Sequence, residues 1–293
     1  MDEFSITPDP TNPRLVKQVE GMDHTGSKSS LSVPMERPLT LFLNGQEIVT
    51  MMTIGDYPDC LAVGYLLNQN MLLADDEIQS IDHDDEIETV VVRTQRRTNY
   101  EEKLRKKTLT SGCAQGTLFG DIMDKLEGIQ LDPNAVVRTS WLYELNRKIN
   151  AQPSIYLEAG AIHGCVLCRE DRPLIYMEDV GRHNAIDKIA GHMFLKNITS
   201  NGKMFYTTGR LTSEMVIKCV QMHIPILVSR SGFTASGVEL ARQTGLTLIG
   251  RSRGKRFSVV AGEHRVILDS DPSEIPNESS RVQRKGGAPE DAP

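Results

Sequence analysis

The chain has 293 residues, of which 39% are hydrophobic and 25% charged, and its formal net charge is −6 at pH 7. These values are typical of a globular protein with an ample core and argue against a nucleic-acid partner or binding to anionic membrane surfaces. No apolar run approaches the roughly 20 residues that span a bilayer, and the acidic start MDEFSITPDP is unlike a signal peptide. We therefore expect a cytoplasmic protein without membrane insertion.

Both ends of the chain lack an apolar period. Residues 1–37 are rich in Ser, Pro, Asp and Lys, and the tail 271–293 has the same character. Segments of this kind bury too little apolar surface to offset the entropy of ordering, so both are predicted to be disordered. Between them we expect a β-rich part at 38–108 and an α/β domain at 109–270.

The β-rich part begins with LTLFLNGQEIVTMMT, in which Asn44-Gly45 separates two strand-like runs. Asn-Gly between such runs is the strongest short-range signal for a hairpin. A helix is then predicted through DCLAVGYLLNQ and a strand through ETVVVRTQ. A further helix is expected from Leu118 to Leu126.

Strands and helices alternate through the rest of the chain. Strands are predicted at SIYLEAG, AIHGCVLCRE, PLIYMEDV, KMFYTTG, IPILVSRS and LTLIGR, and a closing hairpin at RFSVVAGEHRVIL. Helices are predicted at NAVVRTSWLYELNRKIN, GRHNAIDKIAGHMFLK, SEMVIKCVQMH and TASGVELARQTG, the last ending at Gly245. This alternation favours βαβ units and a partly parallel sheet, so the predicted fold class is α/β.

Glycine, hydroxyl and arginine residues follow the ends of several predicted strands. They are Gly209, Arg210, Ser229, Arg230, Ser231, Arg251, Ser252, Arg253, Gly254, Lys255 and Arg256, with Arg182 and His183 after PLIYMEDV. Ligands of open α/β sheets bind beyond the carboxyl ends of the strands, which share one edge. Backbone amides, helix N-termini and guanidinium groups bind anions there. The pattern indicates an anionic ligand with more than one phosphate; the alternative is solvated loops with surface arginines.

Four of the five cysteines are predicted to be core thiols, since a cytoplasmic chain keeps its cysteines reduced. Cys165 and Cys168 form a C-x-x-C, which is compatible with a redox pair or half a zinc site. A zinc site needs a second pair, and none is present, so we expect no zinc. In a strand, residues three apart point to opposite faces. Cys60 and Cys219 fall on apolar faces of predicted helices and are expected to pack there.

Three further titratable residues each have two interpretations. His163 either faces the ligand site or the core. Glu178 and Asp179 are either a catalytic carboxylate pair or acidic residues that complement the dipole of the helix that follows. The fifth cysteine, Cys113, differs from all of these. It lies in LTSGCAQGTL among glycines, hydroxyls and an amide, whereas a buried structural thiol usually has apolar neighbours.

Several motifs in this order resemble the FdhD/NarQ family of accessory sulfurtransferases for formate dehydrogenase. They are TIGDYPDCLAVGYLLNQNMLLADDEI, TSGCAQGT, EDVGRHNAIDK, TTGRLTSEMVIKCVQMHIPILVSRS, SGVELARQTGLTLIG and RSRGKRFSVV. The resemblance implies a cytidine-deaminase-like three-layer domain without zinc. It also implies that persulfide sulfur passes from a cysteine desulfurase to the molybdenum cofactor, bis-molybdopterin guanine dinucleotide, for the formate dehydrogenase apoenzyme. A homodimer is expected from the family.

The resemblance also assigns site residues. The family's cofactor segment matches Arg251 to Arg256, and its persulfide cysteine falls on Cys113. Many members have a C-x-x-C here, whereas Cys113 is followed by Ala114, Gln115 and Gly116, although a persulfide needs only one sulfur acceptor. One alternative is a chaperone that binds the molybdenum cofactor or a guanine nucleotide without transferring sulfur. A nucleotide-processing enzyme is the weaker alternative, because the deaminase pattern H-x-E with P-C-x-x-C is missing.

Overall fold

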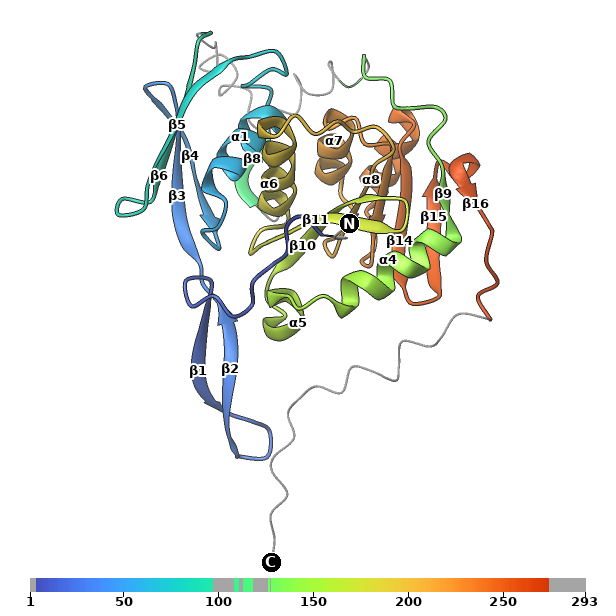
Figure 1. Ribbon diagram of the computed structural model, residues 1–293, viewed down its shortest axis with the longest axis horizontal. Helices are drawn as coiled ribbons and strands as arrows, with labels where there is room; N and C mark the ends of the chain where they lie inside the picture. Colours follow the sequence, from blue (N-terminus) through green and yellow to red (C-terminus); the bar gives the residue numbers. More distant parts are fainter. Residues whose placement is uncertain (1–3, 97–107, 111–112, 118–125, 127, 274–293) are drawn as a thin grey trace, which may run out of the picture.

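A six-stranded sheet forms the framework of the computed structural model, which describes residues 4–96, 108–110, 113–117, 126 and 128–273 (Figure 1). The strand order is β11 (Arg172–Asp179), β10 (His163–Arg169), β12 (Met204–Thr207), β13 (Ile226–Ser229), β14 (Thr247–Arg253) and β15 (Arg256–Ala261). β12, β13 and β14 run parallel, whereas β10 is antiparallel to both β11 and β12, and β15 to β14. The predicted α/β class with a partly parallel sheet is confirmed.

Helices cover both faces of this sheet. They are α6 (Arg182–Leu195), α7 (Ser213–Gln221) and α8 (Ala235–Thr244) on one face and α4 (Thr139–Ala151) on the other. The two-residue period of β10 divides its side chains between these layers. Cys165 packs in the core beneath α6 and α7, and Cys168 packs in the core beneath α4. The expectation of two core thiols on opposite faces is therefore confirmed.

A smaller sheet lies to one side of the main domain (Figure 1). Its order is β4 (Gln46–Thr53), β3 (Arg37–Leu43), β6 (Thr89–Thr94) and β5 (Ile78–Asp84), with α1 (Pro58–Asn68) beside it. The hairpin predicted at Asn44-Gly45 joins β3 to β4, with Asn44 at a left-handed φ of 56°. The predicted helix and strand that follow correspond to α1 and β6.

α1 and α6 cross at two glycines, Gly64 and Gly191. A Cβ on Gly64 would lie 1.8 Å from the backbone oxygen of Asp187, and one on Gly191 would lie 1.9 Å from that of Cys60. Only glycine permits this approach. The crossing merges the apolar side chains of the small sheet and of the main sheet into one core.

Three sequence predictions were wrong. The first is the disorder predicted for residues 1–37, because β1 (Val16–Met22) and β2 (Lys28–Pro34) pair as an antiparallel hairpin that extends from the body of the molecule (Figure 1). Leu15 and Val16 anchor its base by packing with Ile54 and Ile155. The apolar residues of this hairpin are isolated among polar ones, so its sequence shows no apolar period that would predict strands.

The other two errors concern SIYLEAG and the end of the domain. SIYLEAG forms a helix, α5 (Ile155–Ala159), because the Ser154 hydroxyl accepts a hydrogen bond from the amide of Leu157 and Gly160 ends the helix at φ 71°. The predicted closing hairpin does not pair internally. β15 pairs with β14, while β16 (Val266–Ile267) pairs with β9 (Val137–Arg138), which takes Val137 out of the predicted helix.

Some predictions fall on residues that the structure does not describe. These are the helix at 118–126, apart from Leu126, and the tail beyond residue 273. The stretch around Cys113 contains the short strands β7 (Thr108–Thr110) and β8 (Cys113–Thr117), which pair antiparallel. The boundary between 38–108 and 109–270 stays a prediction. Within the described ranges, no helix combines the length and apolar character needed to cross a membrane.

Candidate functional site

The strand directions bring the predicted polar residues to one edge of the main sheet. β11 and β12 are both antiparallel to β10, so β11 runs in the same direction as β12, β13 and β14. The carboxyl ends of these four strands consequently meet at one edge. The register places Thr207 opposite Ser229 and Asp179 opposite His163. We call this edge, with the residues that follow the four strands, the carboxyl edge.

Hydrogen bonds connect the successive loops of the carboxyl edge. The Ser229 hydroxyl donates to the carbonyl of Gly209 at 2.6 Å and accepts from the amide of Ser231 at 2.9 Å. The amide of Arg251 donates to the carbonyl of Ser231 at 2.7 Å. Ser229 and Gly209 are therefore buried supports that hold the loops in place.

The guanidinium groups of the carboxyl edge fall into two classes. Arg210 and Arg256 are exposed. Arg253 is exposed too, and its Nε donates to the carbonyl of Arg230 at 3.0 Å. Arg230 is instead held against the protein. Its Nη1 donates to Asn150 Oδ1 at 2.5 Å, and its guanidinium lies 5.7 Å from the centre of the Tyr156 ring. The exposed arginines are the ones available to an anion.

The residues from 251 to 256 lie on two surfaces, the carboxyl edge and a pocket beside β15. The turn Gly254-Lys255, with Gly254 at φ 53°, joins β14 to β15. Lys255 and Arg256 line a pocket of about 620 Å³ together with Tyr143 and Phe257. Ser252 contributes to neither surface with its side chain, because it is buried and its hydroxyl accepts a hydrogen bond from Asn146 of α4 at 3.0 Å.

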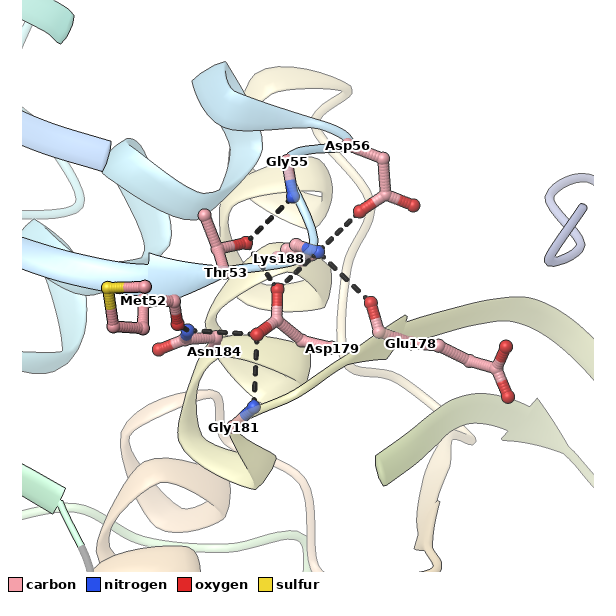
Figure 2. Close-up of polar contacts among 9 residues, drawn as sticks. All are labelled: Met52, Thr53, Gly55, Asp56, Glu178, Asp179, Gly181, Asn184 and Lys188. Carbon is pink, nitrogen blue, oxygen red and sulfur yellow. Dashed lines mark hydrogen bonds and ion pairs between the residues drawn. The ribbon is translucent and has the colours of Figure 1, made fainter. Parts of the chain in front are cut away.

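Asp179 acts as a structural centre where β11 leads into α6 (Figure 2). Its Oδ1 accepts from the amide of Gly181 at 3.0 Å and from Asn184 Nδ2 at 2.9 Å, and its Oδ2 accepts from Thr53 Oγ1 at 2.5 Å. The ammonium of Lys188 lies 2.6 Å from Oδ2. These contacts fix the start of α6, which carries Arg182 and His183.

Glu178 and Asp179 do not form a catalytic pair, because their side chains point away from each other (Figure 2). The Glu178 carboxylate accepts hydrogen bonds from the amides of Ile155, at 2.8 Å, and Tyr156, at 3.0 Å, beneath α5. Burial raises the pKa of Glu178 to about 7, although these amides oppose the shift. The second interpretation, acidic residues at the start of the following helix, holds for Asp179 at α6, whereas Glu178 binds the first amides of α5 instead.

His183 and Arg182 begin α6 and are both largely buried. Nε2 of His183 lies 3.0 Å from a carboxylate oxygen of Glu214 on α7, so this imidazole joins the first turns of two helices at the carboxyl edge. Burial lowers the pKa of His183, while the hydrogen bond with Glu214 acts in the opposite direction. His183 thus forms a contact between α6 and α7.

The buried network around Lys188 was not predicted from the sequence. Lys188 also forms an ion pair with Asp56, which follows β4, and donates to the carbonyl of Glu178 at 3.0 Å. Asp56 and Lys188 lie 132 residues apart in the chain. The local sequence around Lys188 therefore does not distinguish it from an exposed lysine on a helix. Lys188 lies on the side of α6 opposite Ile186, Ile189 and Met193, so the apolar period gave no signal that this lysine is buried.

Burial makes four of the five thiols poor nucleophiles. It raises the pKa of Cys60 to about 11 and that of Cys165 to about 12, and it raises the pKa values of Cys168 and Cys219 as well. The fifth thiol belongs to Cys113, whose side chain lies outside the described part of the structure. Among the side chains that are described, no three His, Cys, Asp or Glu residues gather as metal ligands.

The chain is similar to a known family over most of its length. The model of the FdhD/NarQ family matches residues 34–267. The sulfur carrier protein FdhD of Wolinella succinogenes is 30% identical over 92% of this chain and 98% of that protein. The protein of the same name from Bacillus subtilis is 26% identical over 79% of this chain and 88% of that protein.

A solved structure extends the similarity to three dimensions. The crystal structure of a protein described as a formate dehydrogenase accessory protein, from Desulfotalea psychrophila, matches with a TM-score of 0.68. The two sequences are 25% identical, and the match covers 86% of this chain and 99% of that one. The similarity of fold therefore extends well beyond the individual motifs.

Proposed function

The chain belongs to the FdhD/NarQ family, and from this premise we propose that it is a sulfur carrier that serves formate dehydrogenase. In this proposal Cys113 accepts sulfur from a cysteine desulfurase and holds it as a persulfide. The acceptor is the molybdenum cofactor, bis-molybdopterin guanine dinucleotide, bound at the carboxyl edge for delivery to the formate dehydrogenase apoenzyme. We expect a cytoplasmic homodimer.

The state of the other thiols supports Cys113 as the carrier. Sulfur transfer requires a thiolate, and the thiolate must reach both a donor protein and an acceptor. Cys60, Cys165, Cys168 and Cys219 are all buried with raised pKa values, so at neutral pH they are protonated and out of reach of another protein. This burial is the observation that carries the assignment, because it removes four of five candidates.

The carboxyl edge suits a ligand with several phosphates. Exposed guanidinium groups form charge-assisted hydrogen bonds with phosphate oxygens, often two at a time. Arg210 and Arg253 present such groups, and the pocket beside β15 adds Lys255 and Arg256. The aromatic rings in that pocket suit the base of a guanine nucleotide. When bound, the cofactor would supply the molybdenum centre that receives sulfur, while the chain's own residues hold its phosphates.

A second function is a chaperone that binds the cofactor without transferring sulfur. It is favoured by one observation, namely that Cys113 is followed by Ala114, Gln115 and Gly116 rather than by a second cysteine three residues on. A resolving thiol close to Cys113 is therefore missing from the sequence.

The test is mass spectrometry of the full chain after incubation with a cysteine desulfurase and cysteine. We expect one added sulfur on the peptide that contains Cys113, and its loss in Cys113→Ser. Cys60→Ala is the matched control, because that thiol is buried, and it should still accept sulfur. If Cys113→Ser restores formate dehydrogenase activity in cells that lack the native chain, sulfur transfer is not required and the chaperone takes its place.

A further inference from the structure

His163 lies at the carboxyl edge, but it is neither the proposed sulfur carrier nor one of the residues proposed above to bind phosphate. It is the first residue of β10 and lies opposite Asp179, the last residue of β11. The next residue, Gly164, is held from the other side. Its amide donates to Thr208 Oγ1 at 2.9 Å, and its carbonyl accepts from the amide of Thr208, also at 2.9 Å. The backbone of His163 is thus fixed between the ends of two strands.

The imidazole of His163 lies in the electrostatic field of charged groups from three neighbouring elements. Arg182 and His183 come from the start of α6, Arg210 from the loop after β12, and Asp179 from β11. The side chain is partly buried, and in the part of the chain that the structure describes neither ring nitrogen has a hydrogen-bond partner. An imidazole that is only partly buried and has no described partner can form a hydrogen bond with a ligand at this edge.

The charges around His163 couple its protonation to any anion that binds there. Burial lowers the pKa of His163, and the positive charges of Arg182, His183 and Arg210 lower it further. Asp179 acts in the opposite direction, but its charge is already paired with Lys188. A bound anion would neutralise the cations and offer an oxygen to the ring, so both effects would favour the imidazolium form.

We propose that His163 binds a phosphate group at the carboxyl edge directly and takes up one proton as that group binds. The inference rests on the proposed function, because it assigns a further residue to the same anion site. The ligand class is a phosphate ester or pyrophosphate. Binding should tighten as the pH falls, since the free protein must gain the proton that the complex holds.

The test is isothermal titration calorimetry of the full chain with GDP and with inorganic pyrophosphate. At pH 7 in buffers of different ionisation enthalpy, the wild type should take up close to one proton. Its affinity should fall as the pH rises, by at most about tenfold per pH unit for one proton. His163→Gln should lower the affinity at least about tenfold, the value of one hydrogen bond to a charged group, and abolish the proton uptake. His264→Gln, at an exposed position, is the matched control and should match the wild type.

The outcomes separate this inference from the function on which it rests. If the wild type binds GDP and His163→Gln takes up the same number of protons, His163 is not part of the site, although the anion site stands. If the wild type binds neither ligand, the anion site itself fails. NMR of the wild type gives a measurement that does not depend on how the variant folds. One histidine signal should titrate at higher pH once pyrophosphate is added, and unchanged histidine titrations would overturn the inference.

Discussion

The ammonium nitrogen of Lys188 lies 2.6 Å from a carboxylate oxygen of Asp179, and both side chains are fully buried. Asp56 shares the same ammonium from the segment after β4 (Figure 2). Burial alone would lower the pKa of Lys188, but the charges of Asp179 and Asp56 outweigh it and raise that pKa. One lysine therefore connects the small sheet, the end of β11 and the helix that presents Arg182 to the carboxyl edge.

Removing this lysine should be costly. Lys188→Met leaves Asp179 buried without its counter-ion, and breaking a buried pair in this way typically costs about 3–5 kcal/mol. Chemical denaturation measures the change when both proteins are fitted with the same dependence of the free energy of unfolding on denaturant concentration. Lys196→Met, at an exposed position just after the same helix, should stay within about 0.5 kcal/mol of the wild type. Equal unfolding midpoints for the two variants would show that the buried pair contributes nothing to stability.

The crossing of α1 and α6 should not tolerate a methyl group. Gly64→Ala or Gly191→Ala would place a Cβ less than 2 Å from a backbone oxygen of the facing helix, so the helices must separate. We expect a loss of at least about 1–3 kcal/mol, the usual cost of overpacking. Gly232→Ala is the control, because its new Cβ would have no atom within 4 Å. Thermal unfolding of the three variants measures the difference, and a normal melting temperature for Gly64→Ala would contradict the crossing.

Glu178 should make stability depend on pH. Its pKa in the folded chain is about 7, against about 4.5 for an ordinary glutamate, so the folded state holds more protons between these values. This contribution is fully present below pH 4.5 and is lost as the pH rises through 7. The shift corresponds to ~3 kcal/mol.

The slope of stability against pH is the measurement that isolates Glu178. Glu178→Gln cannot titrate, so it should lack the loss of stability that the wild type shows between about pH 5 and pH 8. In Glu178→Gln a side-chain amide nitrogen, which is a donor, would face the donor amides of α5 and lower the stability at every pH. The slopes are therefore compared instead of the absolute stabilities. Glu239→Gln, at an exposed position on α8, should keep the wild-type slope. A Glu178→Gln slope equal to that of the wild type would refute the assignment.

The arginines after β14 should carry part of the ligand affinity. In Arg253→Ala, Arg256→Ala the affinity for GDP should fall, by about 1.5–3 kcal/mol for each charge-assisted hydrogen bond lost. Added salt should weaken wild-type binding and have less effect on the double variant. Arg172→Ala, an exposed position at the start of β11, serves as the control. Calorimetry that finds the same affinity in the double variant and the wild type would remove these arginines from the site.

The sequence by itself determined most of the main sheet and its edge. Short apolar strands alternate with amphipathic helices, and local signals such as Asn44-Gly45 and Gly245 mark where elements turn or end. Because parallel strands end at one edge, the order of strands along the chain was enough to place the polar residues that follow them close together. These inferences depend on local sequence and on chain connectivity, which act over short distances.

Tertiary structure alone decided which of these residues face a ligand. Ser252 and Arg253 are neighbours in the same strand, so their side chains point to opposite faces, and the packing of α4 decides that Ser252 is buried while Arg253 stays exposed. The pairing of Lys188 with Asp56 depends on two segments 132 residues apart. Such contacts follow from the packing of distant elements around a shared core, so the local sequence at either residue cannot specify them.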